Sequence, residues 1–207
     1  MSVSKTRGFS MVELLIVVSI MLIVLGVSFI QIAPMFKESQ AQTALQTTLG
    51  QMRRAHEMAV DQRQVYRLTF TAPGTIQLDQ VGIDPTTGAK TYTLQSTMTL
   101  PSQIQFAVVT GLPNTTATAP DNYGTGATAI DFDRDFGGGG TQIYFQRDGR
   151  ALDSSNRINN GLIYMCRPGQ LLSCKAVSLI GATGRSKGWM LTQSGAGVAW
   201  SALGWTQ

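Results

Sequence analysis

Residues 8–13 read GFSMVE, and residues 14–30 continue as LLIVVSIMLIVLGVSFI. Glu13 is the one ionisable residue between Met11 and Ile30. A run of about 20 mostly apolar residues is long enough to cross the hydrocarbon core of a bilayer. A buried helix of a small globular protein is rarely apolar on all sides over such a length. The stretch therefore predicts a membrane-spanning helix at the start of the chain.

The charges before this helix predict its orientation. Lys5 and Arg7 precede it, and the positive-inside rule keeps such residues in the cytoplasm. The rest of the 207 residues, enough for one ordinary domain plus an extension, is then expected in the bacterial periplasm, anchored by a single pass in the inner membrane. Two cysteines, Cys166 and Cys174, would lie where disulfides form, and their spacing fits poorly to a zinc site. We predict that they form a disulfide.

The N-terminus differs from an ordinary secretory signal, because its apolar stretch is too long and no A-x-A-like site follows it. The residues from Gly8 to Glu13, after a short basic leader, resemble the prepilin peptidase site of type IV pilins and pseudopilins. The resemblance implies cleavage after Gly8 and methylation of the new N-terminal residue, Phe9. Glycine at the cleaved position lets an active site approach the backbone closely.

Glu13 is costly inside an apolar segment, by roughly 2–3 kcal/mol or more at the bilayer centre. As the fifth residue after the expected cut, it matches the glutamate that in this family is thought to pair with the N-terminal amine of a neighbouring subunit. A buried acceptor of this kind favours the one position where a free ammonium can dock. The alternative is an interfacial glutamate near the end of an anchor helix.

Helical periodicity continues beyond the apolar run but becomes amphipathic, with Leu45, Leu49, Met52, His56 and Ala59 on one face. Pro34 is expected to bend the helix or mark the end of its apolar half. The helix is expected to end near residue 63, and short strands follow. We expect strands at residues 65–71, 75–81, 91–97, 104–109, 142–147, 161–166 and 174–180, and a hairpin turn at 84–88.

Other segments predict loops. Residues 110–128 contain few apolar side chains and two prolines, which is typical of a long exposed loop. Residues 130–136 alternate apolar and charged side chains, as a strand with one charged face does. The expected organisation is a leader (1–8), a membrane or filament-core helix (9–32), an amphipathic helix (33–63), a β-rich periplasmic domain (64–187) and a Gly- and Trp-containing tail (188–207).

The stretch 143–150, with 161–166, 176–180 and Gly184-Arg185, resembles the C-terminal half of the GspH/FimT family of minor pseudopilins and minor pilins. The resemblance implies an α+β pilin fold, in which one long N-terminal helix packs on antiparallel sheets. It implies a filament subunit of a type II secretion pseudopilus, with other pilins, prepilin peptidase and exported proteins as partners. No catalytic activity, cofactor or metal is expected.

Two patterns that resemble a catalytic or a metal site lack the residues that such sites need. His56, the one histidine, has no Ser, Cys or paired carboxylates in a recognisable arrangement, so a packed helix residue is favoured. The carboxylates of 131–135 begin like a calcium loop, but Gly137 falls one position late and Gln142 stands where a bidentate Glu belongs.

The C-terminal region is basic and favours an alternative function. Gly184-Arg185-Ser186-Lys187 resembles the Gly-Arg-x-Arg element of FimT-like minor pilins that bind DNA during uptake. Lysine keeps the charge but loses the planar fork of arginine. Trp189 is placed to stack on a base, as aromatic residues do in single-strand binders. The alternative partner is therefore DNA, bound by Arg185, Lys187 and Trp189, and the competing interpretation is a solvated strand end.

Overall fold

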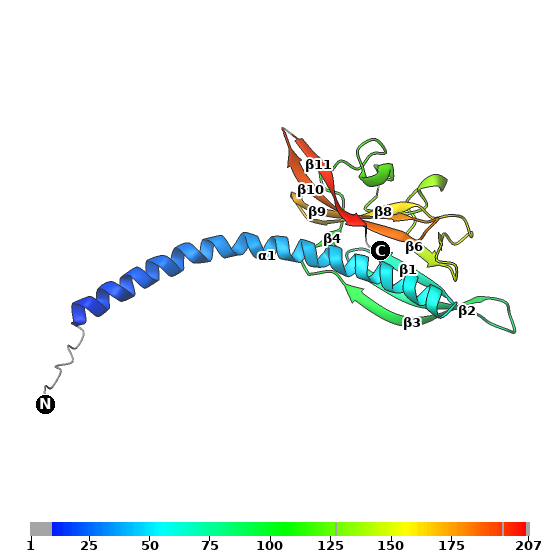
Figure 1. Ribbon diagram of the computed structural model, residues 1–207, viewed down its shortest axis with the longest axis horizontal. Coiled ribbons are helices and arrows are strands. Elements are labelled where there is room, and N and C mark those ends of the chain that lie inside the picture. The colour runs from blue at the N-terminus through cyan, green and yellow to red at the C-terminus, as the bar shows by residue number, and fades with distance from the viewer. Residues whose placement is uncertain (1–9, 127, 196, 206–207) are drawn as a thin grey trace, which may run out of the picture. The chain divides into compact units, whose positions relative to one another are not determined.

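The computed structural model describes residues 10–126, 128–195 and 197–205, and within these the side chains of 27–37 and 204–205 lie outside the description. The chain divides into two compact units, Met1–Glu38 and Ser39–Gln207. A single helix, α1 (Met11–Asp61), begins in the first unit, continues through Pro34 and ends in the second (Figure 1). The described residues of the first unit are helical apart from Ser10, and their described side chains are exposed.

The second unit contains two antiparallel sheets. The first sheet runs in the order β3-β2-β1-β6-β7, and the second in the order β11-β10-β9-β8-β4, with β5 also paired to β8. The strands of the first sheet are β1 (Val65–Thr71), β2 (Thr75–Ile83), β3 (Lys90–Thr99), β6 (Gln142–Phe145) and β7 (Ala151–Leu152). Those of the second are β4 (Gln105–Phe106), β5 (Ile130–Asp131), β8 (Gly161–Arg167), β9 (Gln170–Ile180), β10 (Arg185–Ser194) and β11 (Gly197–Trp205). Two short 3₁₀ helices, η1 (Pro120–Asn122) and η2 (Arg134–Phe136), lie in the connections.

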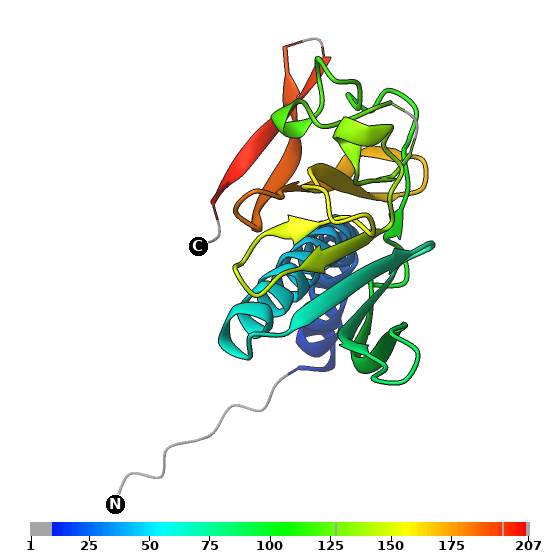
Figure 2. The ribbon, with the colours of Figure 1, turned by 90° about the vertical axis from the view of Figure 1, so that its right-hand side faces the viewer.

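The main core forms between α1 and the two sheets. Small and apolar side chains recur along one face of the helix at helical spacing, and they are fully buried or nearly so. They are Ala41, Ala44, Leu45, Leu49, Met52, Ala55 and Ala59. The same cluster takes in Leu68 and Phe70 from the first sheet and Val177 and Leu179 from the second. Figure 2 shows this part of α1 lying against both sheets.

A second, smaller core lies on the opposite face of the second sheet. The connection between β4 and β5 covers that face and contributes Leu112 and Ala119. The sheet contributes Leu162, Tyr164 and the two cysteines. The second sheet is therefore buried on both faces, which explains why every residue of β8 is buried.

The predicted α+β class, a long N-terminal helix on antiparallel sheets, is confirmed. The strands expected at 65–71, 75–81, 91–97, 161–166 and 174–180 are all present, and the hairpin turn follows Ile83. The strand expected at 104–109 is shorter, at Gln105–Phe106. Residues beyond Gly188, expected as a tail, form most of β10 and β11 instead.

One expectation was wrong, and another was right only in part. The segment 130–136 has only two strand residues, Ile130–Asp131, before it turns into η2. The segment 110–128 is a loop, as predicted, but parts of it are buried, because Leu112 and Ala119 pack on the second sheet. In both segments, hydrogen bonds between side chains and backbone hold the chain in an irregular path that alternation along the sequence does not reveal.

Candidate functional site

The N-terminal candidates lie at the start of α1. Gly8 and Phe9 fall outside the described residues. Glu13 is in the first turn of the helix and exposed, a position where a carboxylate interacts favourably with the positive end of the helix dipole. The apolar side chains around it are also exposed, at 67% for Val12, 59% for Leu14 and 66% for Leu15. None of the helical segments that the structure describes is long and apolar enough to cross a membrane.

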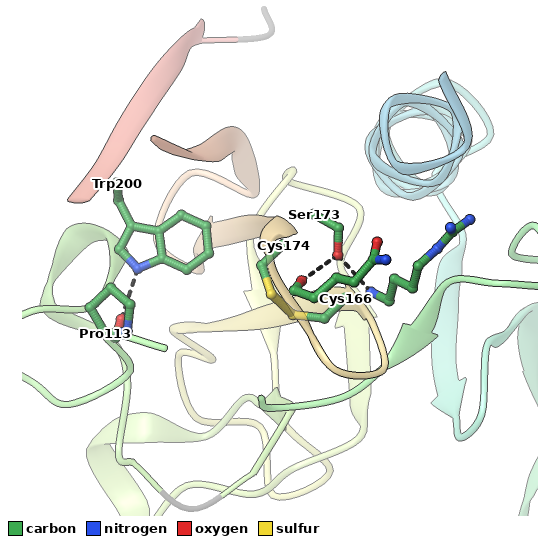
Figure 3. The surroundings of a disulfide bond; sticks show 7 residues. Pro113, Cys166, Ser173, Cys174 and Trp200 are labelled. Atoms are coloured by element: carbon green, nitrogen blue, oxygen red, sulfur yellow. Dashed lines mark hydrogen bonds between the residues drawn. A yellow bond between two sulfur atoms is a disulfide. The ribbon is translucent and has the colours of Figure 1, made fainter. Parts of the chain in front are cut away.

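The two cysteines are joined, as predicted, across the hairpin formed by β8 and β9. The Cα atoms of Cys166 and Cys174 are 4.2 Å apart, and both residues are fully buried in the smaller core (Figure 3). The turn that they close is fixed from inside: the Ser173 hydroxyl donates to the Gln170 carbonyl at 2.6 Å and accepts the Arg167 N–H at 3.0 Å. The disulfide therefore closes a tight turn that these two hydrogen bonds also stabilise.

This hairpin also contacts the helix. The guanidinium of Arg167 donates from Nη2 to Oε1 of Gln40 at 2.9 Å, and the arginine is only 8% exposed. Gln40 lies five residues before the first large buried residue of α1, Leu45. The stapled hairpin therefore holds the helix at the point where its buried face begins.

Arg185, Lys187 and Trp189 stand on alternate positions of β10, so their side chains share one face of the second sheet. The opposite face carries Ser186 and Gly188, and a Cβ added at Gly188 would lie 3.0 Å from Leu49. The candidate DNA-binding residues thus point away from α1, and the structure places them on one face of the second sheet.

Lys187 and Trp189 are held by partners inside the protein. The Lys187 ammonium lies 3.7 Å from Oδ1 of Asp121 in η1 and 4.1 Å from the centre of the Trp189 ring. The Trp189 indole N–H donates to Ser178 Oγ at 2.9 Å, and the Ser178 hydroxyl donates in turn to Asp121.

Asp121 was missed by the sequence reasoning, which placed it in an exposed loop. Its backbone is in the left-handed region, with φ 48°, as is that of Asn122, with φ 59°. Asp and Asn tolerate this conformation better than most residues, and this tolerance is the one local signal that marks the turn. Lys187 is 14% exposed, so part of the positive charge expected to meet phosphate is directed at Asp121, whereas Arg185 is exposed.

The acidic segment is a structural element. The Asp131 carboxylate, fully buried, accepts the Thr125 N–H at 2.8 Å, the Thr125 hydroxyl at 2.6 Å and the Gly139 N–H at 3.0 Å. Burial raises the pKa of Asp133, and the negative charge of Asp153 adds to that effect, while Arg157 opposes it. Within the part of the chain that the structure describes, no group of three or more His, Cys, Asp or Glu residues is arranged to hold a metal ion.

His56 is half-buried on α1, and its ring meets Phe145 edge to face at a centroid distance of 6.0 Å. Gly184 and Gly149 lie against it, because a Cβ at Gly184 would come within 2.7 Å of His56 Cδ2 and one at Gly149 within 2.9 Å of Nε2. This packing matches the predicted role of a packed helix histidine.

Comparison with known proteins finds a match at the N-terminus. Residues 3–29 match the family model described as the prokaryotic N-terminal methylation motif. No curated protein matches the chain significantly. Among solved structures, the minor pseudopilin EpsH from the type 2 secretion system of Vibrio cholerae is similar, with 13% sequence identity and a TM-score of 0.40 over 80% of this chain and 98% of that one. The chain therefore carries the prokaryotic N-terminal methylation motif, which confirms the type IV pilin-like N-terminus predicted from Gly8 to Glu13.

Proposed function

We propose that this chain is a non-catalytic filament subunit, a minor pseudopilin of a type II secretion system, which prepilin peptidase cleaves after Gly8 and methylates on Phe9. The observation that carries the proposal is the methylation motif over residues 3–29, joined to a helix that leads into a compact β-rich domain. A filament subunit needs these parts in this order: a processed N-terminus, an apolar helix and a folded domain. The folded domain is here the second unit, Ser39–Gln207, which we call the head.

The exposed apolar side chains of α1 support the same proposal. Those described between Met11 and Leu25 range in exposure from 42% for Val17 to 89% for Met11. An isolated chain with such a surface associates with other apolar matter. In the proposed cycle, this surface lies first in the inner membrane and then among the helices of other subunits, an exchange between two apolar environments that costs little. The head then remains in the periplasm.

Glu13 would set the register of the assembled helices. In an apolar surrounding, its carboxylate is stabilised by a charge-assisted hydrogen bond from the new N-terminal amine of a neighbouring subunit. The resemblance of the β-rich domain to the GspH/FimT family, which includes minor pseudopilins and minor pilins, supports a filament subunit in either machine.

The test is co-expression of the full chain with a prepilin peptidase and its assembly machinery, with two measurements. Intact mass should show loss of residues 1–8 and addition of one methyl group. Glu13→Ala should still be cleaved, but its recovery in sheared filaments should fall at least about tenfold, the equivalent of about 1.4 kcal/mol. Glu57→Ala, which removes an exposed glutamate from the same helix, is the matched control and should assemble normally. Normal assembly of Glu13→Ala, or an uncleaved wild-type chain, would contradict the proposal.

A second candidate function is DNA capture by a type IV pilus, and the shared face of Arg185, Lys187 and Trp189 favours it. Binding that depends on phosphate contacts weakens as salt rises, because each contact releases counterions. We would titrate the full chain in detergent with single-stranded DNA at several salt concentrations. If this function holds, Arg185→Ala with Lys187→Ala should lower both the affinity and the salt slope.

Arg53→Ala with Arg54→Ala is the matched control, since it removes the same charge from an exposed part of α1. Equal losses in both double variants would indicate a non-specific charge effect, and this would count against capture by β10. No binding at low salt would remove DNA capture and leave the filament role intact.

A further inference from the structure

One end of the first sheet carries a pocket that neither proposed function uses. It has a volume of about 280 Å³ and lies where β1 begins, β2 ends, β3 begins and β6 ends. Figure 1 labels these four strands. Val65 pairs with Val81 at this end, and Ile83 pairs with Lys90. The pocket is on the face turned away from α1, because Tyr66 and Leu68, which alternate with Val65 and Arg67, belong to the main core.

The base of the pocket is apolar. Val65 and Val81 are half-buried side by side, and Ile83, 72% exposed, extends the apolar surface toward the turn after β2. Apolar lining with a few convergent polar groups is the usual composition of a small-ligand site. An aliphatic side chain of a ligand would remove this apolar surface from water, which favours binding.

The rim is cationic and rich in amides. Lys90 from β3 and Arg147, just after β6, line it, together with the amide-bearing residues Gln64, Gln146 and Asn156. Among the described residues that line the pocket, none is Asp or Glu. The Lys90 ammonium lies 5.1 Å above the centre of the Tyr144 ring, a contact that leaves its charge uncompensated by an anion.

The carboxylates closest along the sequence to the residues that line the pocket interact with other groups. Asp79 pairs with Arg67 at 2.7 Å, and Asp148 pairs with Arg150 at 2.7 Å. Asp84 accepts the backbone N–H groups of Thr86 and Thr87, at 2.7 and 3.1 Å, which lowers its pKa and fixes it in the turn. Hydrogen bonding leaves Asp84 negatively charged, so the two cations Lys90 and Arg147 outnumber this one nearby carboxylate beside the apolar surface of the pocket.

We propose that this pocket binds the free C-terminal carboxylate of a polypeptide whose last residue is aliphatic. The carboxylate would lie between Lys90 and Arg147, where arginine can bind it through two parallel N–H groups. The last side chain would cover Val65 and Val81, and the amides would bind the final peptide groups. A volume of about 280 Å³ is at the low end for ligand sites, which suits one or two residues rather than a long segment.

The chemistry distinguishes this ligand from a nucleic acid. A phosphate chain needs a track of cations and gains little from an apolar base, whereas a terminal residue uses the charge and the base together. Capture of a chain end is independent of which machine the filament serves, and an exported protein or a sibling subunit offers the same group.

The test uses the full chain in detergent and the probe N-acetyl-alanyl-leucine, followed by ligand-observed NMR. We expect a dissociation constant in the millimolar range for the free acid and at least tenfold weaker binding of its C-terminal amide. Lys90→Gln with Arg147→Gln should reduce binding of the acid to the level of the amide. Arg53→Gln with Arg54→Gln, on exposed positions of α1 outside the pocket, should leave it unchanged.

The assignment would be overturned by equal binding of acid and amide, by unchanged binding in the Lys90 and Arg147 variant, or by no binding of the acid at millimolar concentration. Tighter binding of phenyl phosphate than of the peptide acid would also overturn it, in favour of a phosphate ligand. Thermal melting of each variant, expected at the wild-type temperature, separates loss of the pocket from loss of the fold. Filament assembly is measured separately through Glu13, so failure of the pocket assignment and failure of the proposed filament function give different results.

Discussion

Asp153 organises the turn that precedes β8. Its side chain is 1% exposed, and its carboxylate accepts the backbone N–H groups of Ser155 and Arg157, each at 2.8 Å. The same carboxylate forms an ion pair with the Arg157 guanidinium at 2.6 Å. Burial alone would raise the pKa of Asp153, but these hydrogen bonds and the neighbouring charge outweigh burial and lower it. The carboxylate is therefore more stable ionised in the folded chain than in the unfolded one.

This difference predicts a pH dependence with a definite sign. A carboxyl group whose folded pKa lies below its usual value of 3.8 stabilises the fold above that value and loses this contribution as pH falls through the folded pKa. Asp153→Asn should destabilise the chain by about 1–3 kcal/mol at pH 7, because a buried, charge-assisted acceptor is lost. Its stability should then fall less steeply below pH 4 than that of the wild type.

Urea denaturation at pH 7, 5, 4 and 3 measures both effects. Asp148→Asn is the control, since its pKa is also lowered but its side chain is 49% exposed, and its effect should be smaller. Parallel pH curves for wild type and Asp153→Asn would refute the assignment.

At the same scale, the sequence predicted residues whose role follows from their chemistry and missed those whose role follows from a turn. The Cys166–Cys174 pair could be predicted from compartment and spacing, and it is present. Asp131 was expected on a solvent-facing strand but accepts three hydrogen bonds internally. Short carboxylates that bond to nearby backbone have no periodic signature, and Asp121 escaped prediction for that reason.

At the scale of elements, the hairpin of β10 and β11 differs most from expectation, because its Gly, Ser and Ala content conceals two strands. Trp200 explains how this hairpin is anchored. Its indole N–H donates to the Pro113 carbonyl at 2.7 Å (Figure 3). Its ring stacks on Tyr164 at a centroid distance of 5.7 Å. Contacts across 87 positions of sequence cannot be read from composition, whereas the local pattern of β1 and β2 can.

Trp200→Ala should therefore release the connection between β4 and β5 from the second sheet. We expect a loss of about 2–4 kcal/mol, since an aromatic contact and a hydrogen bond are removed together. Trp200→Phe keeps the stacking and removes only the hydrogen bond, so its loss should be about 1 kcal/mol. Limited proteolysis, with the cleavage sites mapped by mass, should show new cuts within residues 107–123 in the alanine variant. Resistance equal to the wild type would mean that the loop is held by its own contacts.

At the scale of the whole molecule, the fold class could be predicted, but the order of strands could not. The long helix and the short runs after it indicate an α+β protein, as found. The pairing of β1 with β6, more than seventy residues apart, depends on which apolar faces cover α1, and several orders satisfy the same sequence pattern. The division into Met1–Glu38 and Ser39–Gln207 also follows from burial, because the main core begins at Ala41.

That division predicts that residues 39–207 fold alone. Exported to the periplasm, this fragment should be monomeric, contain the disulfide and melt within about 2–4 °C of the full chain in detergent, a difference of about 1 kcal/mol for this size. A fragment that begins at Gln51 lacks Ala41, Ala44, Leu45 and Leu49. Each leucine contributes about 1.5–3 kcal/mol, and the exposed sheet faces add to the loss.

Because total stability is about 5–15 kcal/mol, the shorter fragment should be unfolded or aggregated. Circular dichroism shows whether each of the two fragments is folded, and gel filtration shows whether it is monomeric. A misfolded 39–207 fragment would show that residues before Ser39 support the head. A stable fragment from Gln51 would show that the sheets hold together without the first buried turns of α1, and that the Arg167–Gln40 contact does not secure the fold.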